Sequence, residues 1–424
     1  MRLPVVRHLT SPVFEAPIMH SFIPRGWGCG ALVLLLHAGS AWADGDRSTL
    51  PPDRAVALAL SAHPDIRNAE LAVATTDAAR SAAAVLLSNP TANAWFSPDG
   101  RRAEVGASQP FSFSGEGWHA RAAARERGAA AMASLQRARR VLAATVRQAY
   151  IDAVVATGLV AVAQEGADLA ARLRVGVLRK LEEGESSELD LRLARLAEVQ
   201  AATRLLEARR NQADALRVLS ALVLVPVDEG DLALDPLEAA PAVDPARAPR
   251  RADLEAAELS LEAARLELRR ARAATMPPVS LGVGVRVEDG ETFVGPSVGL
   301  TFPIFDRNQE ERARALGDVE VADARLQSLK ARVDAEQSTA AARRREADAA
   351  AGVEGAELQE ARAALASIES GVLAGEIDLP TAVLLQTQVL QGEAAVVTLR
   401  GLVADARLDE LLALDDDVLL GGAP

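Results

Sequence analysis

Two long stretches without proline constrain the fold most. They cover about residues 118–182 and 308–371 and are rich in Ala, Leu, Arg and Glu, which favours helix. At about 1.5 Å per residue, each predicted helix would be roughly 100 Å long, more than a compact domain can use. Apolar residues of the first recur at coiled-coil spacing, and many are small. Because each helix is expected to reverse near a glycine, Gly184 or Gly375, the chain is predicted to contain two hairpins of closely packed long helices.

A strict period of two marks residues 279–287. The odd positions are Val, Leu, Val, Val and Val, whereas the even positions are Ser, Gly, Gly and Arg, which predicts a strand with one apolar face. The predicted turn is Glu-Asp-Gly at 288–290, and the returning strand ends near residue 302. Strands of about nine residues match the roughly 9 to 11 that cross a bilayer at a tilt. The side chains predicted to face lipid are Leu281, Val283, Val285, Val294, Val298 and Leu300.

A second, weaker strand pair is predicted at about residues 91–109. Ala92, Ala94 and Phe96 alternate with other residue types, and a Ser-Pro-Asp-Gly turn follows. Alone, this pair would fit a soluble hairpin equally well. Eight of the nine aromatic residues after residue 43 fall in the windows 95–118 and 293–305, as expected for rings at membrane interfaces. The correspondence between the two pairs therefore favours a membrane location for both.

The same order of elements occurs twice along the chain. We therefore predict a mainly α fold with minor β, built from two tandem repeats, each a β-hairpin plus a long α-helical hairpin. A segment rich in Pro, Asp and Ala separates them. The predicted segments are a signal peptide at 1–43, a first repeat at 44–224 with its helical hairpin at about 118–222, a linker at 225–249, a second repeat at 250–415 with its helical hairpin at about 308–414, and a C-terminal tail at 416–424.

The N-terminal segment has the pattern of an export signal. Arg25 precedes a short apolar stretch, and Ala41-Trp42-Ala43 fits a signal peptidase site, so cleavage is expected before Asp44. A retained N-terminal anchor is the alternative. Translation is expected to start at either Met1 or Met19.

The exported chain is predicted to be acidic and free of thiols. Removing residues 1–43 takes away three Arg and one Glu, so the formal charge changes from −13 to −15, which opposes nucleic-acid binding. The only cysteine, Cys29, precedes the apolar stretch, so no lipid anchor, disulfide or cysteine nucleophile is expected. No window of about 20 apolar residues is found after residue 43, so membrane spans are expected to be strands.

Motifs for catalysis are absent from the sequence. His63 and His119 are the only histidines after residue 43, and they lie on segments predicted to be far apart. Neither an H-E-x-x-H motif nor a phosphate-binding glycine loop nor a serine elbow occurs. With only Met132 and Met276 as further soft ligands, no ladder of metal ligands is expected. We predict a protein that is not an enzyme and has no cofactor or resident metal.

Four strands cannot close a barrel, because an open sheet edge in lipid leaves backbone groups unpaired. Three copies would supply twelve strands, enough for a closed barrel continued by a helical tube. Further sequence features are Asn89-Pro90, Gln109-Pro110-Phe111, Gly115-Glu116, Arg121, the two glycine turns and the block Phe302-Pro303-Ile304-Phe305-Asp306-Arg307-Asn308-Gln309. In these features the chain resembles the TolC-like outer membrane factor family, and within it the heavy-metal, CzcC-like branch. The resemblance covers nearly all of the exported chain.

The resemblance implies a homotrimeric exit duct of a tripartite efflux system. Its barrel would lie in outer membrane lipid, and its α-helical tunnel would cross the periplasm to a periplasmic adaptor and an inner-membrane pump of the RND type. Heavy-metal cations are the implied substrate. The helical turns would then be tips that dock the adaptor and open as an iris, formed by Gly184, Glu185, Ser186, Ser187, Gly375, Glu376, Ile377 and Asp378.

Two residues beyond these tips are candidates for a gate. The resemblance implies an aspartate six residues after the second tip glycine, where this chain has Thr381, whereas the first copy has Asp190. Glu376 and Asp378 could supply negative charge instead. A drug, organic-solute or type I secretion channel is the alternative function. A periplasmic coiled-coil adaptor is a further alternative, although an adaptor would combine one helical hairpin with several soluble β modules.

Overall fold

The computed structural model describes residues 49–421, apart from 84–88, 99–100, 234–249, 301, 303–304, 306, 352–366, 369, 373 and 375. Several predicted features lie outside the described residues: the signal peptide with Cys29 and its cleavage site, most of the linker, the tip residue Gly375, and parts of the second long helix and of the 302–309 block.

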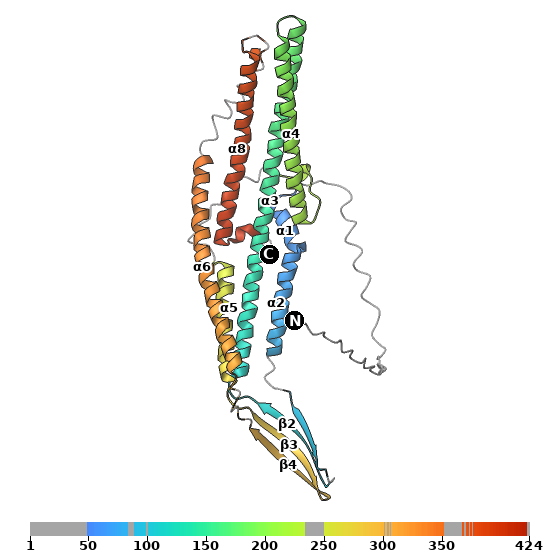
Figure 1. Cartoon of the computed structure of the whole chain (residues 1–424), viewed down its shortest axis with the longest axis vertical. Helices are drawn as coiled ribbons and strands as arrows, with labels where there is room; N and C mark the ends of the chain where they lie inside the picture. The colour runs from blue at the N-terminus through green and yellow to red at the C-terminus, as the bar shows by residue number, and fades with distance from the viewer. Residues whose placement is uncertain are drawn as a thin grey trace, which may run out of the picture. The chain divides into compact units, whose positions relative to one another are not determined.

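The protein is mainly helical with a small antiparallel sheet, as predicted. Figure 1 shows the long helices side by side, with the sheet beyond one end of them. Helix α3 alone has 67 residues. The described helices are α1 (Pro52–Ala62), α2 (Pro64–Ala83), α3 (Glu116–Glu182), α4 (Glu188–Val223), α5 (Ala252–Ala273), α6 (Gln309–Ala351) and α8 (Leu379–Leu414), with the short 3-10 helices η1 (Glu229–Asp231) and η2 (Asp417–Leu420).

The sheet joins the two halves of the chain. Its strands are β1 (Thr91–Phe96), β2 (Arg102–Phe111), β3 (Val279–Glu288) and β4 (Glu291–Leu300), paired antiparallel in the order β1-β2-β3-β4. Strands β3 and β4 are connected by Asp289 and Gly290, both with positive φ, which is the conformation that a two-residue hairpin turn requires. Strands β2 and β3, far apart in sequence, pair over their full length.

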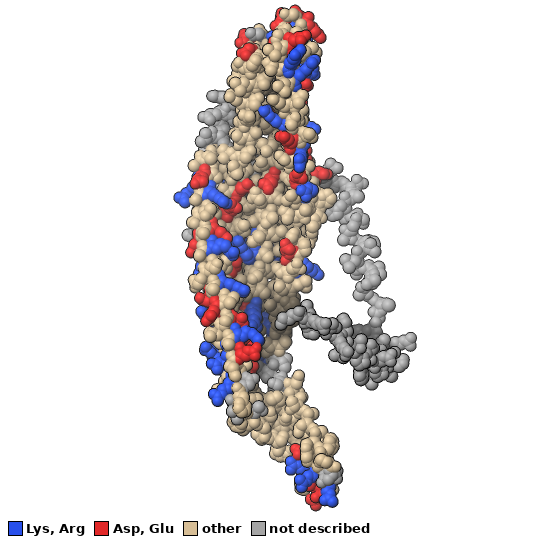
Figure 2. Space-filling view, in the orientation of Figure 1, with Lys and Arg blue, Asp and Glu red and all other residues tan. Residues whose placement is uncertain are grey.

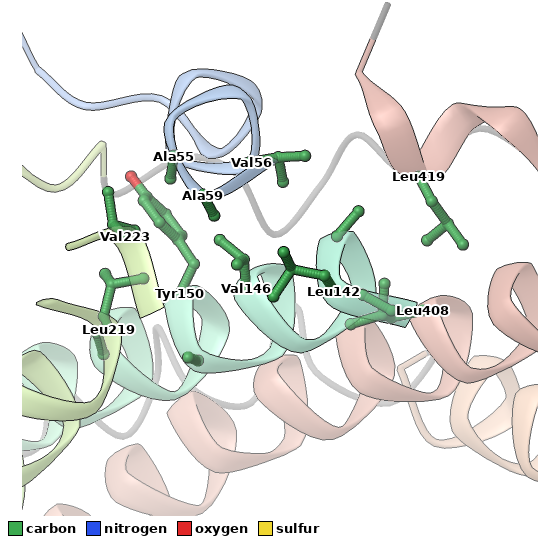
Figure 3. Close-up of a cluster of buried hydrophobic side chains, with 14 of the residues drawn as sticks. Ala55, Val56, Ala59, Leu142, Val146, Tyr150, Leu219, Val223, Leu408 and Leu419 are labelled. Carbon is green, nitrogen blue, oxygen red and sulfur yellow. The ribbon is translucent and has the colours of Figure 1, made fainter. Parts of the chain in front are cut away.

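An apolar core around Tyr150 holds the two halves of the helical part together. The Tyr150 hydroxyl donates a hydrogen bond to the Leu50 carbonyl and accepts one from the Ala233 N–H, both at 2.8 Å. The only polar group of this buried side chain is therefore satisfied. Figure 3 shows the side chains that converge here from α1, α3, α4, α8 and η2, namely Ala55, Val56, Ala59, Leu142, Val146, Leu219, Val223, Leu408 and Leu419.

A fully buried carboxylate, Asp415, ends α8. The Asp415 side chain is 0% exposed. It accepts hydrogen bonds from Arg137 and Arg140 of α3 and from the N–H of Ala252 at the start of α5, each at 2.7 Å. Arg140 also donates to Asp417 of η2, at 2.6 Å. This cluster ties α3, α5, α8 and η2 to one another.

Helices α3 and α8 pack through small residues. A Cβ added at Gly158 would lie 2.9 Å from Val397, and one at Gly401 would lie 2.6 Å from Val155. Contacts this short are not possible for larger residues without movement of a neighbour. The predicted close packing of small residues therefore occurs where the two halves of the chain meet.

Two helices contain apolar stretches that a search for uninterrupted apolar runs does not find. Helices α3 and α8 each contain a stretch that is long and apolar enough to cross a membrane by length and composition. The sequence reasoning considered only uninterrupted apolar runs, whereas these stretches include charged residues. Such stretches also occur in core helices, so they are weak evidence for a helical span. In the described part of the structure, 33% of the α3 stretch and 11% of the α8 stretch are buried.

Candidate functional sites: the helical turns and the sheet

The first helical turn is built by a left-handed glycine. Gly184 has a φ of 79°, and its N–H donates to the Leu181 carbonyl while that of Glu185 donates to the Lys180 carbonyl. This pair of hydrogen bonds satisfies the last carbonyls of α3 and turns the chain away from the helix. Glu185 and Ser187 are exposed in this turn, and Ser186 is half-buried.

Asp190, the gate candidate of the first half, closes the N-terminus of α4. Its Oδ2 accepts hydrogen bonds from the Ser187 N–H (3.0 Å), the Ser187 hydroxyl (2.7 Å) and the Ser186 hydroxyl (3.1 Å). In return, Ser187 Oγ accepts from the Asp190 N–H, which completes a capping box. The hydrogen bonds from Ser187 lower the pKa of Asp190. The carboxylate therefore stays ionised and directed at its own helix end.

The second turn has a cap at the corresponding position, but here the acidic residue is the cap itself. Asp378 caps α8, and its Oδ2 accepts from the N–H of Thr381 at 3.4 Å. Hydrogen bonding with the Thr381 side chain, and to a smaller extent with the Thr381 backbone, lowers the pKa of Asp378. Thr381 thus occupies the position that Asp190 has in the first half. In the first half the cap is Ser and the acid lies three residues later, whereas in the second half the cap is itself the acid.

An apolar cluster joins the two turns. Ile377, predicted to contact the adaptor, is half-buried, and a Cβ added at Gly371 would lie only 2.8 Å from its Cδ1. The Lys180 ammonium also donates to the carbonyl of Val372, at 2.7 Å. Ile377 therefore packs between the turns, whereas Glu376 and Asp378 are exposed. The cluster is formed by Leu173, Val177, Leu191, Ala194, Ile368, Val372, Leu379 and Ala382.

Leu189 is a tip residue that the sequence reasoning missed. It lies in the first turn of α4, two residues after Ser187, and its side chain is 64% exposed. An apolar residue in an otherwise polar helical turn was the available signal. The exposed surface of the first tip therefore combines Glu185, Ser187 and this leucine.

The sheet presents one apolar face that is exposed among the described residues. The register places Leu281 opposite Val298, Val283 opposite Pro296 and Val285 opposite Val294, so the six residues predicted to face lipid share one side. All six are exposed, up to 69% for Val298. In the described chain, β1 and β4 are the two edges of the sheet. Exposed apolar patches of this kind mark contacts with a partner or a membrane.

The opposite face of the sheet is lined mostly by small and polar residues. It includes Gly106, Ser108, Gly282, Gly284, Gly295 and Ser297. A Cβ at Gly282 would lie 2.5 Å from the Ala107 carbonyl oxygen and 2.7 Å from Ser108 Cβ, so only glycine fits at this point. An arginine at Gly282 is therefore excluded by its contacts, although this position lies off the apolar face.

A half-buried acid lies between α3 and α8. The Gln148 amide donates to Asp405 Oδ1 at 2.8 Å and to Asp152 Oδ1 at 3.3 Å, so one amide serves two carboxylates. Burial raises the pKa of Asp405 to about 6, and the negative charges of Asp152 and Asp409 act in the same direction, while the hydrogen bond from Gln148 opposes them. Among the described residues, no group of three potential His, Cys, Asp or Glu ligands is arranged to hold a metal ion.

We expect the stability of the protein to fall as the pH rises through about 6. Because the pKa of Asp405 in the folded protein lies above its ordinary value of 3.8, folding favours the protonated acid, and this stabilisation is complete below the ordinary value and lost above the raised one. Asp405→Asn should remove that part of the pH dependence, measured as the unfolding midpoint at a series of pH values. The matched control is Asp168→Asn, which changes an exposed carboxylate also bonded by a glutamine, Gln164. An unchanged pH dependence in Asp405→Asn would contradict this expectation.

No family model and no curated protein matches the sequence. Solved structures do match: CusC, studied for its folding and transmembrane channel formation, has a TM-score of 0.70 at 18% identity, over 88% of this chain and 95% of its own. The CmeC outer membrane channel of Campylobacter jejuni has a TM-score of 0.71 at 17% identity, over 86% and 85%. The chain has the fold of an outer membrane channel.

A third outer membrane channel gives the same result. The open state of MtrE from Neisseria gonorrhoeae matches with a TM-score of 0.68 at 22% identity, over 86% of this chain and 89% of that one. Each of the three similarities covers most of both chains, with 86% to 88% of this chain matched.

Proposed function

We propose that this protein is the outer membrane channel of a tripartite efflux system, assembled as a homotrimer. The observation that carries the proposal is the four-stranded sheet. It has one exposed apolar face, two unpaired edges and direct connections to very long helices. A sheet edge cannot remain open in lipid, so β1 of one copy would pair with β4 of the next until the ring closes. Three copies would give twelve strands.

The two faces of the sheet indicate which side would line the channel. Glycine in a strand marks a bend or a close approach of backbones, and the contacts around Gly282 lie on the small-residue face. That face would be the concave inside of the barrel. The apolar face with Val283 and Val294 would then contact lipid, and the exposed rings of Phe113, Trp118, Phe302 and Phe305 near the helical end would lie at the membrane interface.

The helical turns are the proposed docking site for the periplasmic adaptor, which would connect the duct to an inner-membrane pump. The first lies between α3 and α4 and the second at the start of α8, both remote from the sheet, and they expose polar and acidic groups together with Leu189. Asp190 and Thr381 remain the proposed gate positions. Because the Asp190 carboxylate has three donors in its cap, opening by this residue would require it to leave them. Export through an N-terminal signal removed after Ala43, without lipidation at Cys29, completes the proposal.

Heavy-metal cations are the substrate that the sequence resemblance favours. The described residues contain no cluster of metal ligands, so a passive duct would leave substrate choice to the pump and adaptor. A channel for drugs, organic solutes or secreted proteins uses the same architecture. Resistance of cells to metal salts and to drugs, with and without this gene, separates these substrates.

Substitutions in the two helical turns test this function. Glu185→Trp and Glu376→Trp place a bulky ring at exposed positions whose side chains take no part in the caps or the apolar cluster. If the turns dock an adaptor, both variants should abolish efflux while trimer assembly and unfolding midpoint stay unchanged, since exposed substitutions typically alter stability by within about 0.5 kcal/mol. The measurement is cell resistance to the exported compound, together with trimer content of outer membranes.

The matched control is Glu229→Trp, which changes an exposed glutamate of η1 away from both turns. This variant should keep normal resistance. Cysteines introduced at Glu185 and Glu376 should also form crosslinks to the adaptor. Normal resistance in both tip variants without any crosslink would exclude the turns as the docking site, and the absence of a detergent-extracted outer membrane trimer would exclude the channel itself.

A further inference from the structure

On the small-residue face of the sheet, one row near the hairpin ends consists of large aromatic and charged side chains. The register places Trp95 opposite Glu104, Glu104 opposite Arg286, and Arg286 opposite Phe293. These four side chains therefore form one continuous row across all four strands. The next two rows toward the helices contain only small or neutral residues, namely Asn93, Gly106, Gly284 and Gly295, then Thr91, Ser108, Gly282 and Ser297.

The charged members of this region are paired across β2 and β3. Arg286 Nη2 and Nε donate to Glu104 Oε2, at 2.8 and 3.2 Å. One row further out, Arg102 Nη2 lies 2.6 Å from Glu288 Oε1. These four residues line, with Trp95 and Ala103, a cavity of about 240 Å³. Figure 2 shows the charged atoms of the sheet gathered at its hairpin end, with uncharged surface between them and the helices.

We propose that the row of Trp95, Glu104, Arg286 and Phe293 forms a constriction of balanced charge at the outer mouth of the duct. This inference rests on the proposed function, in which three sheets close into a barrel with the small-residue face inside. The helices extend toward the periplasm, so the hairpin ends face the cell exterior. Each copy then contributes two aromatic rings and one ion pair to a ring of side chains, directly above a wall of glycine and serine.

The size and charge of these side chains determine which solutes the row would admit. Glycine and serine rows leave the lumen wide, whereas the indole, the phenyl ring and the two long charged side chains extend into it. The Arg286 and Glu104 charges cancel within each pair, so the intact ring favours neither sign of solute. Rings of uncompensated charge select the opposite ion. Removing one partner should therefore give the mouth a sign preference that the native ring lacks.

Thiol labelling from outside intact cells tests the constriction without opening the periplasmic end. Gly295→Cys places a thiol one row below Phe293, where an added Cβ meets nothing within 4 Å. In this background, a bulky membrane-impermeant maleimide should react slowly and a small one fast. Combined Trp95→Ala and Phe293→Ala should raise the rate of the bulky reagent several-fold and leave the small reagent unchanged. Phe96→Ala is the matched control, because Phe96 lies in the same hairpin on the opposite face.

Small charged methanethiosulfonates test the charge balance of the ring in the same background. Glu104→Gln should favour the anionic reagent over the cationic one, and Arg286→Gln should do the reverse. Equal rates of the bulky reagent with and without the two aromatic rings, in cells that contain the trimer, would overturn the constriction. Labelling of Val294→Cys in place of Gly295→Cys by the polar reagents would overturn it as well, because the row would then face lipid. Absence of the outer membrane trimer would instead refute the proposed function.

Discussion

Asp415→Ala is expected to destabilise the protein by about 3 to 5 kcal/mol, the usual cost of breaking a buried ion pair by removing one partner. The Asp415 carboxylate is 0% exposed and accepts from Arg137, Arg140 and the Ala252 N–H. Its loss leaves the Arg140 guanidinium, which is only 8% exposed, with Asp417 alone, and leaves the first N–H of α5 unsatisfied. The midpoint of thermal unfolding, followed by the helical circular dichroism signal, measures the loss.

Two variants make this expectation specific. Asp415→Asn should cost less, because asparagine also tolerates the left-handed φ of 60° at this position and keeps one carbonyl acceptor. Asp409→Ala removes a carboxylate of the same helix whose ion pair with Arg343 is largely exposed, and it should cost within about 1 kcal/mol. Equal losses in Asp415→Ala and Asp409→Ala would contradict a role for the buried cluster.

Val283→Arg is expected to prevent assembly of the channel in the membrane. Val283 lies near the middle of β3 on the apolar face and is 54% exposed. If this face contacts lipid, an arginine near mid-bilayer costs about 2 to 4 kcal/mol in every copy of the trimer. The measurement is the yield of heat-modifiable trimer in outer membrane preparations.

The matched control for Val283→Arg is Gly284→Arg at the same depth. Gly284 lies on the opposite face, and an added Cβ there meets no atom closer than 3.8 Å. Ser280→Arg is a second control on that face, nearer the helices. Both controls should assemble well. Equal loss of trimer in Val283→Arg and Gly284→Arg would contradict the assignment of the apolar face to lipid.

Much of this fold follows from local sequence pattern. Long proline-free runs extend as helices because no residue in them interrupts the backbone hydrogen bonds, and Asp289-Gly290 turns because both residues accept positive φ. The glycine after the first long helix likewise predicted the end of α3. These features need only neighbouring residues, which is why the mainly helical fold with a small sheet was predictable.

The candidate site was predictable only in part. The tip positions followed from the glycine turns and the family resemblance, but the sequence did not show that Ile377 packs inward against Gly371 or that Leu189 is exposed. The proposed gate positions, Asp190 and Thr381, also lie at helix N-termini, where Asp190 completes a capping box and the Thr381 N–H donates to Asp378. An acidic residue a few positions after a helical turn can serve as a helix cap or as a gate. The sequence pattern alone therefore does not separate these two roles.

The sequence by itself determined the long helices, the alternation of the strands and the apolar identity of one sheet face, because each depends on residues close together in the chain. Only the tertiary structure decided which residues meet across the two halves. The pairing of Glu104 with Arg286 and the burial of Asp415 between Arg137 and Arg140 join residues more than 180 positions apart. Such contacts depend on strand register and helix packing, since a shift of one residue would turn Glu104 and Arg286 to opposite faces.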